Sequence, residues 1–259
     1  MLRPRIIPCL LIRDKGLIKT QQFKSSRYLG DPINAVRIFN EKQVDELMVL
    51  DIDASKQNKE PDYKMIDKMA SECRMPLCYG GGIQTVEQAQ RIFSLGVEKI
   101  SLSSVAIRKP ELIPDIVEKV GSQSVVVTLD VKKKIFGGYD VWIHNGTINT
   151  KISPETWVKK FEELGVGEIV INSIDKDGMM KGYDYQLTDK IFKATHVPVT
   201  FLGGAGSLAD IEEVVKRYGS IGVAAGSIFV FKGNYKAVLI NYPTSEEKNE
   251  INYLSPLEA

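Results

Sequence analysis

Short groups of glycine and serine occur twice in the chain at nearly the same spacing, and these residue types can bind phosphate. Backbone N–H groups in glycine turns can approach an anion closely, and serine hydroxyls add further donors. The simpler alternative is that the glycines only make tight turns. We predict two phosphate sites, one formed by Gly81, Gly82, Ser103 and Ser104, the other by Gly203, Gly204, Gly226 and Ser227.

A carboxylate that could transfer protons stands at the end of one apolar run. The run VVVTLD (125–130) ends in Asp130, and a carboxylate placed at a strand end can act as a general acid or base. The similar run RIIPCLLIR (5–13) has Leu11 at the matching place, and Asp14 falls beyond it in a loop. A solvated strand-end carboxylate is the alternative for Asp130. We predict that Asp130 is the catalytic residue.

These side chains need a scaffold that brings several strand ends together. Apolar runs without clean alternation are separated by amphipathic segments, as expected for parallel strands buried on both faces. The helical segments start with capping pairs, Asp31-Pro32 and Ser153-Pro154, and the latter stops at Gly165. Eight such units predict an α/β fold, a (β/α)8 TIM barrel whose active site lies where the strands end. The predicted strands are 6–11, 47–52, 76–81, 99–104, 125–130, 168–173, 197–202 and 221–226.

Two segments interrupt this alternation, and both follow predicted strands. Residues 12–30 predict a long first loop that is rich in basic and polar residues. Residues 131–150 predict a small hairpin with turns at Gly137-Gly138 and Asn145-Gly146. Both segments should therefore lie on the face where barrel enzymes hold their active sites.

The two halves of the chain resemble each other. Gly203 follows Gly81 by 122 residues, and Ser227 follows Ser104 by 123. Glu46 and Glu168, also 122 residues apart, lie in matching runs. Matches in register at strand ends predict a barrel built from two half-barrels. We expect a single barrel domain over 1–259, with half-barrels of about 1–122 and 123–240 and a tail of about 241–259.

Composition predicts an ordinary globular protein of the cytoplasm. Of 259 residues, 43% are hydrophobic and 26% are charged, and the formal net charge is +1. This balance argues against a nucleic-acid partner, and no apolar segment is long enough to span a bilayer. Cys9, Cys73 and Cys78 form no CxxC pair, which favours reduced thiols. No metal site and no cofactor are expected, since His144 and His196 neighbour no cysteine or carboxylate cluster.

Six motifs together resemble one known family. They are RIIPCL, DELMVLDI, GGGI, GSQSVVV-x-x-D, SIDKDG-x-x-x-GYD and GGAG, and they extend to about Phe231. The chain is similar to HisF, the cyclase subunit of imidazole glycerol phosphate synthase, a barrel of the ribulose-phosphate-binding type. The resemblance implies a heterodimer with a glutaminase, HisH. Ammonia from the glutaminase would convert a bis-phosphorylated ribulosyl intermediate into imidazole glycerol phosphate and an aminoimidazole carboxamide ribotide.

The resemblance also implies roles for residues at the strand ends. The family uses two aspartates, at the ends of strands 1 and 5, and these positions correspond to Leu11 and Asp130 here. Lys19 corresponds to the family's basic loop residue, and Asp177 and Gly178 of SIDKDG are expected to contact the substrate. Because leucine carries no proton, the acid–base pair is incomplete. Further departures from the family lie at Ser103, Met179 and Leu202.

The opposite ends of the strands carry a second set of charged residues. The resemblance implies an ammonia gate, a ring of four side chains that we call the floor ring: Arg5, Glu46, Lys99 and Glu168. Ordinary surface charge is the alternative, although two cations and two anions on one axis can neutralise each other. Asp45 and Glu98 lie beside this ring, where the family docks its glutaminase.

Three functions fit these residues. The first is a HisF-like subunit that accepts ammonia from a HisH-type glutaminase and serves a third, amidating enzyme. That enzyme would convert a sugar acetamido group into an acetamidino group in surface-polysaccharide (lipopolysaccharide, O-antigen) biosynthesis. The second is the cyclase of histidine biosynthesis, and the third is a non-catalytic scaffold that binds a phosphorylated small molecule and conducts ammonia.

Overall fold

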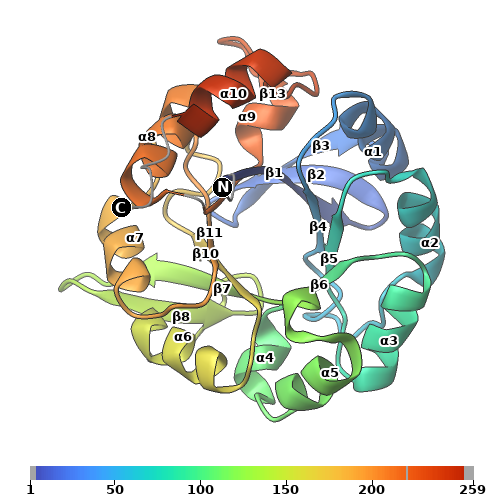
Figure 1. Cartoon of the computed structure of the whole chain (residues 1–259), viewed down its shortest axis with the longest axis vertical. Helices are drawn as coiled ribbons and strands as arrows, with labels where there is room; N and C mark the ends of the chain where they lie inside the picture. The colour runs from blue at the N-terminus through green and yellow to red at the C-terminus, as the bar shows by residue number, and fades with distance from the viewer. Residues whose placement is uncertain (1–3, 220, 254–259) are drawn as a thin grey trace.

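A closed barrel of parallel strands forms the centre of the protein in the computed structural model, which describes residues 4–219 and 221–253 (Figure 1). The barrel strands are β1 (Arg5–Arg13), β4 (Leu47–Asp51), β5 (Leu77–Gly80), β6 (Lys99–Leu102), β7 (Val125–Lys133), β10 (Glu168–Ser173), β11 (Val199–Leu202) and β12 (Gly222–Ala225). Within the described residues each pairs in parallel with the next, and β12 returns to β1. The predicted (β/α)8 barrel is confirmed.

Helices follow the strands and surround the barrel (Figure 1). They are α1 (Pro32–Glu41), α2 (Tyr63–Glu72), α3 (Val86–Ser94), α4 (Ser104–Arg108), α5 (Leu112–Val120), α6 (Pro154–Glu163), α7 (Tyr185–Phe192), α8 (Leu208–Tyr218), α9 (Ser227–Val230) and α10 (Ser245–Tyr253). A single 3₁₀ turn, Ser122–Ser124, precedes β7. No helix among the described residues combines the length and the apolarity that a membrane crossing requires.

Two helix starts show how local sequence fixes these elements. The Asp31 side chain accepts a hydrogen bond from the Asn34 N–H at 2.9 Å, which satisfies one of the free donors at the start of α1. Ser153 caps α6 in the same way, because its hydroxyl accepts from the Thr156 N–H at 3.2 Å. Both predicted caps are confirmed.

The first long loop is not a loop, and that prediction is wrong. Strand β1 continues to Arg13, and β2 (Gly16–Gln21) and β3 (Ser25–Gly30) follow it as an antiparallel hairpin. The sequence pattern does not indicate a strand at β3, because β3 lies on the surface and buries no apolar face.

The second interruption is a hairpin, as predicted. β8 (Tyr139–Ile143) pairs antiparallel with the end of β7, and β9 (Ile148–Asn149) pairs with β8. Gly137-Gly138 and Asn145-Gly146 lie in the two turns and have positive φ angles.

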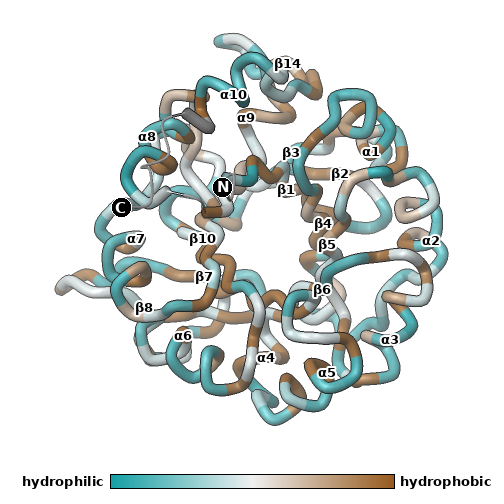
Figure 2. Tube along the Cα trace, in the orientation of Figure 1, coloured by the Kyte–Doolittle hydropathy of each residue, from teal (hydrophilic) through white to brown (hydrophobic). Residues whose placement is uncertain are grey.

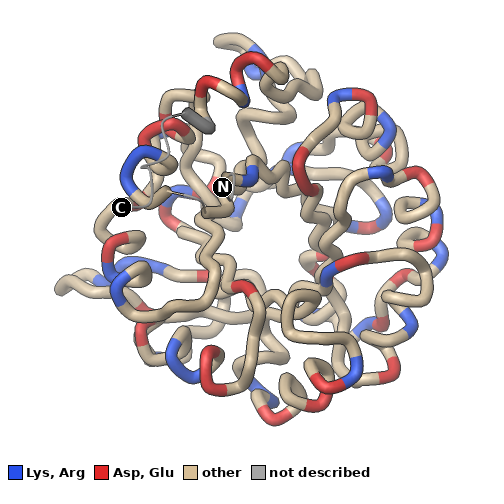
Figure 3. The backbone as a smooth tube through the Cα atoms, viewed as in Figure 1, with Lys and Arg blue, Asp and Glu red and all other residues tan. Residues whose placement is uncertain are grey.

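Apolar side chains fill two regions. The larger core lies between the strands and the helices and includes Phe39 and Phe161. A smaller cluster fills the inside of the barrel, and its members are Ile7, Cys9, Met48, Cys78, Val126, Val170, Leu202 and Ala224. Figure 2 shows the strands as the hydrophobic part of the chain, and Figure 3 shows most charged residues on the surrounding helices. Strands buried on both faces explain the continuous apolar runs.

The C-terminal segment packs onto the barrel. The strands β13 (Phe231–Lys232) and β14 (Ala237–Val238) form a short hairpin before α10. The Tyr242 hydroxyl donates to the Ile6 carbonyl at 2.8 Å and accepts from the Asp45 N–H at 3.1 Å. Ile251 of α10 is buried in the core. Much of the predicted tail is therefore part of the fold, while 254–259 lie outside the described residues.

Candidate functional site

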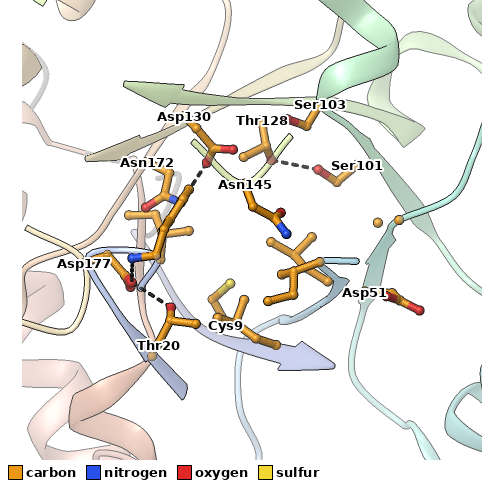
Figure 4. Close-up of a pocket in the computed structure, with 18 of the residues that line it drawn as sticks. Cys9, Thr20, Asp51, Ser101, Ser103, Thr128, Asp130, Asn145, Asn172 and Asp177 are labelled. Atoms are coloured by element: carbon orange, nitrogen blue, oxygen red, sulfur yellow. Dashed lines mark hydrogen bonds between the residues drawn. The ribbon is translucent and has the colours of Figure 1, made fainter. Parts of the chain in front are cut away.

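A pocket opens at the mouth of the barrel, which we define as the end where the eight strands finish (Figure 4). Strand ends, the β2–β3 hairpin and the β8–β9 turn supply its walls. The sequence-predicted residues that line it are Lys19, Gly81, Gly82, Ser103, Ser104, Asp130, Asp177, Gly178, Gly203, Gly204, Gly226 and Ser227. The fold thus brings the whole predicted mouth set into one pocket, and the role of each residue stays a prediction.

Asp130 lies in β7 and has a neutral partner. The strand register places Asn172 of β10 opposite Asp130, and the Asn172 Nδ2 donates to Asp130 Oδ1 at 2.9 Å (Figure 4). Burial raises the pKa of the Asp130 carboxyl to about 7; the Asn172 hydrogen bond lowers it and the charge of Asp177 raises it. A carboxyl with this pKa can both accept and donate a proton near neutral pH.

Leu11 lines the same pocket from β1. It is paired with Leu50 in the strand register, and both pack against the apolar cluster inside the barrel. Leu202 of that cluster also lines the pocket. Asp14 lies in the turn between β1 and β2 with φ 48°, so it does not take the place of an acid in the strand. The wall of the pocket around Leu11 is therefore apolar.

Lys19 and Asp177 form a buried ion pair at the pocket wall. Lys19 Nζ donates to Asp177 Oδ1 at 2.6 Å, and the Thr20 hydroxyl donates to Asp177 Oδ2 at 2.8 Å (Figure 4). The pair ties the β2–β3 hairpin to the segment after β10. The Lys19 stem also packs on Gly226, where an added Cβ would lie 3.0 Å from Lys19 Cε.

The two glycine turns have matching surroundings. Gly81 and Gly203 have φ angles of 122° and 96°, which side chains other than glycine rarely adopt. A Cβ at Gly81 would collide with the Asp51 carbonyl oxygen, and one at Gly203 would lie 3.0 Å from the Ser173 carbonyl oxygen. Each turn therefore packs against the end of the preceding barrel strand.

The serines of the two predicted phosphate sites differ in their partners. Ser104 Oγ accepts a hydrogen bond from the His144 N–H at 3.0 Å. Ser227 Oγ is buried and has no hydrogen-bond partner among the described residues. A buried hydroxyl without a partner costs free energy unless a ligand or water completes it, so Ser227 is placed to donate to an anion.

The sequence analysis does not identify several residues in the pocket or beside it. The Asp53 carboxylate accepts from Arg13 Nε at 2.6 Å and from Asn145 Nδ2 at 2.9 Å, which joins three mouth segments. The sequence predicts Asn145 only as a turn residue. Asn172, the partner of Asp130, ends an apolar run in the same manner as Asp130, and that position was the available signal.

A further carboxylate, at the end of β4, lies at the mouth. Asp51 ends β4, and Figure 4 places it across the pocket from Asp130. Burial raises its pKa, whereas hydrogen bonds from the Ala54 and Asp53 N–H groups lower it. Asp51 Oδ1 thereby organises the turn after β4, which is a structural task.

The floor of the barrel, where the strands begin, brings the four floor-ring residues together. Arg5 is hydrogen bonded to Glu46, and its Nη2 lies 2.9 Å from Glu168 Oε1. Lys99 Nζ lies 2.8 Å from Glu46 Oε2 and 2.9 Å from Glu168 Oε2. Each cation therefore contacts both anions, and the gating role of this ring stays a prediction.

Pairing keeps the floor ring charged despite its burial. Burial alone raises the pKa of Glu168, but Arg5 and Lys99 outweigh it and the net pKa is lowered. Burial lowers the pKa of Lys99, yet the nearby Glu168 and Glu46 raise it above its ordinary value. The Thr200 hydroxyl donates a further hydrogen bond to Glu168. Removing one member would leave a buried charge without its partner.

The two acids beside the floor ring cap strand starts. Asp45 Oδ2 accepts from the Ile6 N–H at 3.0 Å, and Lys248 of α10 contacts its other oxygen at 2.9 Å. Glu98 Oε2 accepts from the Leu77 N–H at 2.8 Å. Both acids satisfy backbone donors at the floor, which explains acidic residues there without a partner protein.

Cysteines and histidines add no metal site to the described part of the chain. Cys9, Cys73 and Cys78 are free, and no group of three potential ligands from histidine, cysteine, aspartate or glutamate occurs in residues 4–219 and 221–253. Burial raises the pKa of the Cys9 thiol to about 12. Cys9 is therefore a protonated thiol at neutral pH.

Comparisons with known proteins agree with this architecture. A family model described as "Histidine biosynthesis protein" matches residues 5–236. A Vibrio vulnificus protein provisionally named imidazole glycerol phosphate synthase subunit hisF3 is 56% identical over 251 residues, 96% of each chain.

Two further relatives show a graded similarity. A Pseudomonas aeruginosa protein provisionally named subunit hisF2 of the same synthase is 55% identical, over 94% of this chain and 97% of the relative. The imidazole glycerol phosphate synthase subunit HisF of Lactococcus lactis is 40% identical, over 88% of this chain and 89% of the relative.

Proposed function

Because the chain belongs to the histidine biosynthesis protein family as a homologue of the HisF subunit, we propose that it is an ammonia-accepting synthase subunit of the imidazole glycerol phosphate synthase type. The observation that carries the proposal is one barrel with both parts that this reaction needs. A charged ring closes the floor, and a pocket with an acid of pKa about 7 opens at the mouth.

The floor ring is the proposed entry for ammonia. A HisH-type glutaminase would dock over it as the second subunit of a heterodimer. Beyond the ring, the barrel interior is apolar, with Cys78 and Val126 among its residues. Ammonia is small and uncharged, so an apolar passage admits it, whereas ammonium would have to lose its hydration there.

The mouth pocket is the proposed site of a ligand with a phosphate at each end. Gly82 with Ser104 would hold one phosphate, and Gly204 with Ser227 the other, both through N–H and O–H donors. The unpartnered, buried Ser227 hydroxyl supports the second site. The matching contacts of Gly81 and Gly203 would be explained by a half-barrel duplication.

Asp130 is the proposed proton-transfer group between the two phosphate turns. Its pKa of about 7 lets it accept a proton from incoming ammonia or donate one to a leaving oxygen. Because Leu11 in β1 cannot transfer a proton, Asp130 acts without a partner acid on the other face of the substrate. Losing one partner costs roughly a hundred- to ten-thousand-fold in rate.

A second candidate function is favoured by Leu11 itself. An apolar pocket wall and an incomplete acid–base pair are consistent with a subunit that delivers ammonia to another reaction. In that case a third enzyme would use the ammonia to amidate a sugar acetamido group for a surface polysaccharide. A purely ammonia-conducting, phosphate-binding scaffold is the limiting form of this candidate.

To test the proposed function, the purified chain is supplied with the bis-phosphorylated ribulosyl substrate and saturating ammonium salt. Formation of imidazole glycerol phosphate, slow and dependent on Asp130, is the expected result. A rate of about 1 per second or more would show that Asp130 alone suffices. If wild type formed no more product than Asp130→Asn, the cyclase function would be excluded and ammonia delivery favoured.

A further inference from the structure

The turn between β8 and β9 projects into the mouth from the hairpin that extends β7. The turn comprises residues 144–147, and we call it the strap. Both His144 and Asn145 of the strap line the mouth pocket. Figure 4 shows Asn145 near the middle of this pocket, between Asp130 and Asp51. The strap therefore occupies the centre of the mouth rather than its rim.

Contacts on the far side of the mouth hold the strap in this place. Asn145 Nδ2 donates to Asp53 Oδ1 at 2.9 Å, and Asp53 lies in the segment that follows β4. Asp53 Oδ2 in turn accepts from Arg13 Nε, at the end of β1, at 2.6 Å. A Cβ at Gly146 would lie 3.2 Å from the Phe23 ring, so the strap also packs against the β2–β3 hairpin. The strap thus forms a bridge from β7 to the segments that follow β1 and β4.

The order of the strands decides where this bridge lies relative to the two predicted phosphate turns. Around the barrel the order is β1, β4, β5, β6, β7, β10, β11 and β12. One phosphate turn follows β5 and β6, and the other follows β11 and β12, so the two turns face each other across the mouth. β7 and β4 lie on opposite sides of the line that joins these turns. A ligand with a phosphate at each end therefore has to cross the contact between Asn145 and Asp53.

The backbone of the strap depends on its contacts. The φ angles of His144, Asn145 and Gly146 are 52°, 57° and 69°, and residues other than glycine adopt such angles uncommonly. Backbone in these regions persists where surrounding contacts hold it. The His144 N–H donates to Ser104 Oγ at 3.0 Å, which ties the strap to the start of α4. A few hydrogen bonds thus keep the strap closed, and their loss would release it.

We propose that the strap is a latch that must release Asp53 before a ligand with a phosphate at each end can enter or leave the mouth. The inference rests on the two proposed phosphate sites. A ligand with a single phosphate reaches its turn from one side of the strap and needs no opening. The latch therefore retains the intact ligand, whereas fragments that carry one phosphate each leave freely.

Amide hydrogen exchange of the ligand-free chain, followed by NMR, measures the opening of the strap directly. The His144 N–H should be protected in wild type and should exchange about tenfold faster in Asp53→Ala, because the hydrogen bond from Asn145 to a carboxylate is lost. An exposed, unprotected His144 N–H in wild type would overturn the inference.

Asn149→Ala is the matched control. Asn149 Nδ2 donates to Asp140 Oδ2 at 3.1 Å, so the same hairpin contains a second amide–carboxylate contact, and neither residue lines the mouth pocket. Exchange at His144 should stay within about twofold of wild type in this variant. Equal acceleration in the two variants would mean that the whole hairpin loosens and that Asp53 is no latch.

Stopped-flow fluorescence measures ligand entry. Trp157→Phe in every chain leaves Trp142 of β8 as the only tryptophan. The two-phosphate probe is the proposed ribulosyl substrate without ammonia, and glycerol phosphate is the single-phosphate probe. The observed rate for the two-phosphate probe should reach a plateau as its concentration rises, since opening limits entry, and Asp53→Ala should raise that plateau about tenfold. The rate for glycerol phosphate should rise linearly in both chains.

The outcomes separate this inference from the proposed function, because calorimetry establishes independently whether each probe binds. Two-phosphate binding without a plateau, or a plateau that Asp53→Ala leaves unchanged, would overturn the latch and leave the phosphate sites standing. A plateau for glycerol phosphate as well would also overturn it, since the strap would then cover both turns alike. Absence of binding of either probe would overturn both the latch and the phosphate sites on which it rests.

Discussion

At the floor of the barrel, four charges at the beginnings of four strands neutralise one another, whereas at the mouth Asp130 has only a neutral amide as its hydrogen-bond partner. Both regions are buried, and burial alone raises the pKa of a carboxyl group. At the floor, Arg5 and Lys99 reverse that effect, and the pKa of Glu168 is lowered. At the mouth nothing reverses it, and the pKa of Asp130 is about 7.

The comparison shows that the partner of a buried acid, rather than its burial, decides its task. Glu168 stays ionised at every physiological pH, so it can hold a fixed arrangement but cannot exchange protons. Asp130 changes its protonation state near neutral pH, so it can act in proton transfer. The four predictions below would break or sharpen this contrast.

The largest effect is expected for Asp130→Asn. The variant keeps the side-chain shape and a polar contact with Asn172, but it cannot transfer a proton. Ammonia-dependent cyclisation should fall by roughly a hundred- to ten-thousand-fold, or about 3–5 kcal/mol of barrier. Steady-state rates with saturating ammonium salt give the measurement.

Asp140→Asn is the matched control for this change. Asp140 is a buried carboxylate in β8 that accepts from Asn149 and does not line the pocket. Its rate should stay within about twofold of wild type. Equal losses in the two variants would mean that the effect is structural and that the mouth acid has no special role.

A smaller effect, in the opposite direction, is expected for Leu11→Asp. A carboxylate at this position of β1 would restore the acid–base pair with Asp130, and cyclisation should rise by about ten- to a hundredfold. Leu202 and Met179 remain unchanged, so full recovery is not expected. Leu11→Asn, which adds polarity without an acid, should leave the rate low; a similar gain there would assign the effect to pocket polarity.

The unfolding free energy of the protein should also depend on pH through Asp130. The folded carboxyl keeps its proton up to about pH 7, whereas the unfolded one loses it near its ordinary pKa of 3.8. Stability from this residue is therefore present at low pH and is lost as the pH rises through 7. Compared with wild type, Asp130→Asn should gain about 1–3 kcal/mol in unfolding free energy between pH 4 and pH 8.

Urea unfolding of both proteins at the two pH values measures this gain. Water in the open pocket reduces the gain below the full value that a shift of this size would give. A variant that follows the pH dependence of wild type would show that the Asp130 pKa is close to ordinary, and the contrast with the floor would disappear.

The smallest effect is expected at the floor, for Lys99→Ala. The change removes one cation that contacts both Glu46 and Glu168, so part of the ammonia should escape to solvent before it reaches the mouth. With a co-purified HisH-type glutaminase, glutamine-dependent turnover should fall about fivefold relative to turnover with free ammonia, or roughly 1 kcal/mol. An unchanged ratio of the two rates would remove the gate from the proposed function.

Local sequence predicted much of the fold. Apolar runs of strand length, capping pairs such as Asp31-Pro32, and the Asn145-Gly146 turn depend on neighbours in the chain, and each matches its element. The β2–β3 hairpin could not be predicted in this way. Its surface strand, β3, buries no apolar face and has no apolar periodicity, although β1 with β2 and β2 with β3 pair residues that are close in the chain.

The sequence by itself determined which chemical groups the protein possesses: an acid at the end of one strand, a leucine at the matching position of another strand, and glycines where a side chain would collide. Only the tertiary structure decided what those groups can do. Closure of the barrel sets Asn172 opposite Asp130 and brings Glu168 to Arg5 across 163 residues. Protonation and pairing depend on burial and on distances of a few ångströms, and both are properties of packed strands rather than of neighbours in the chain.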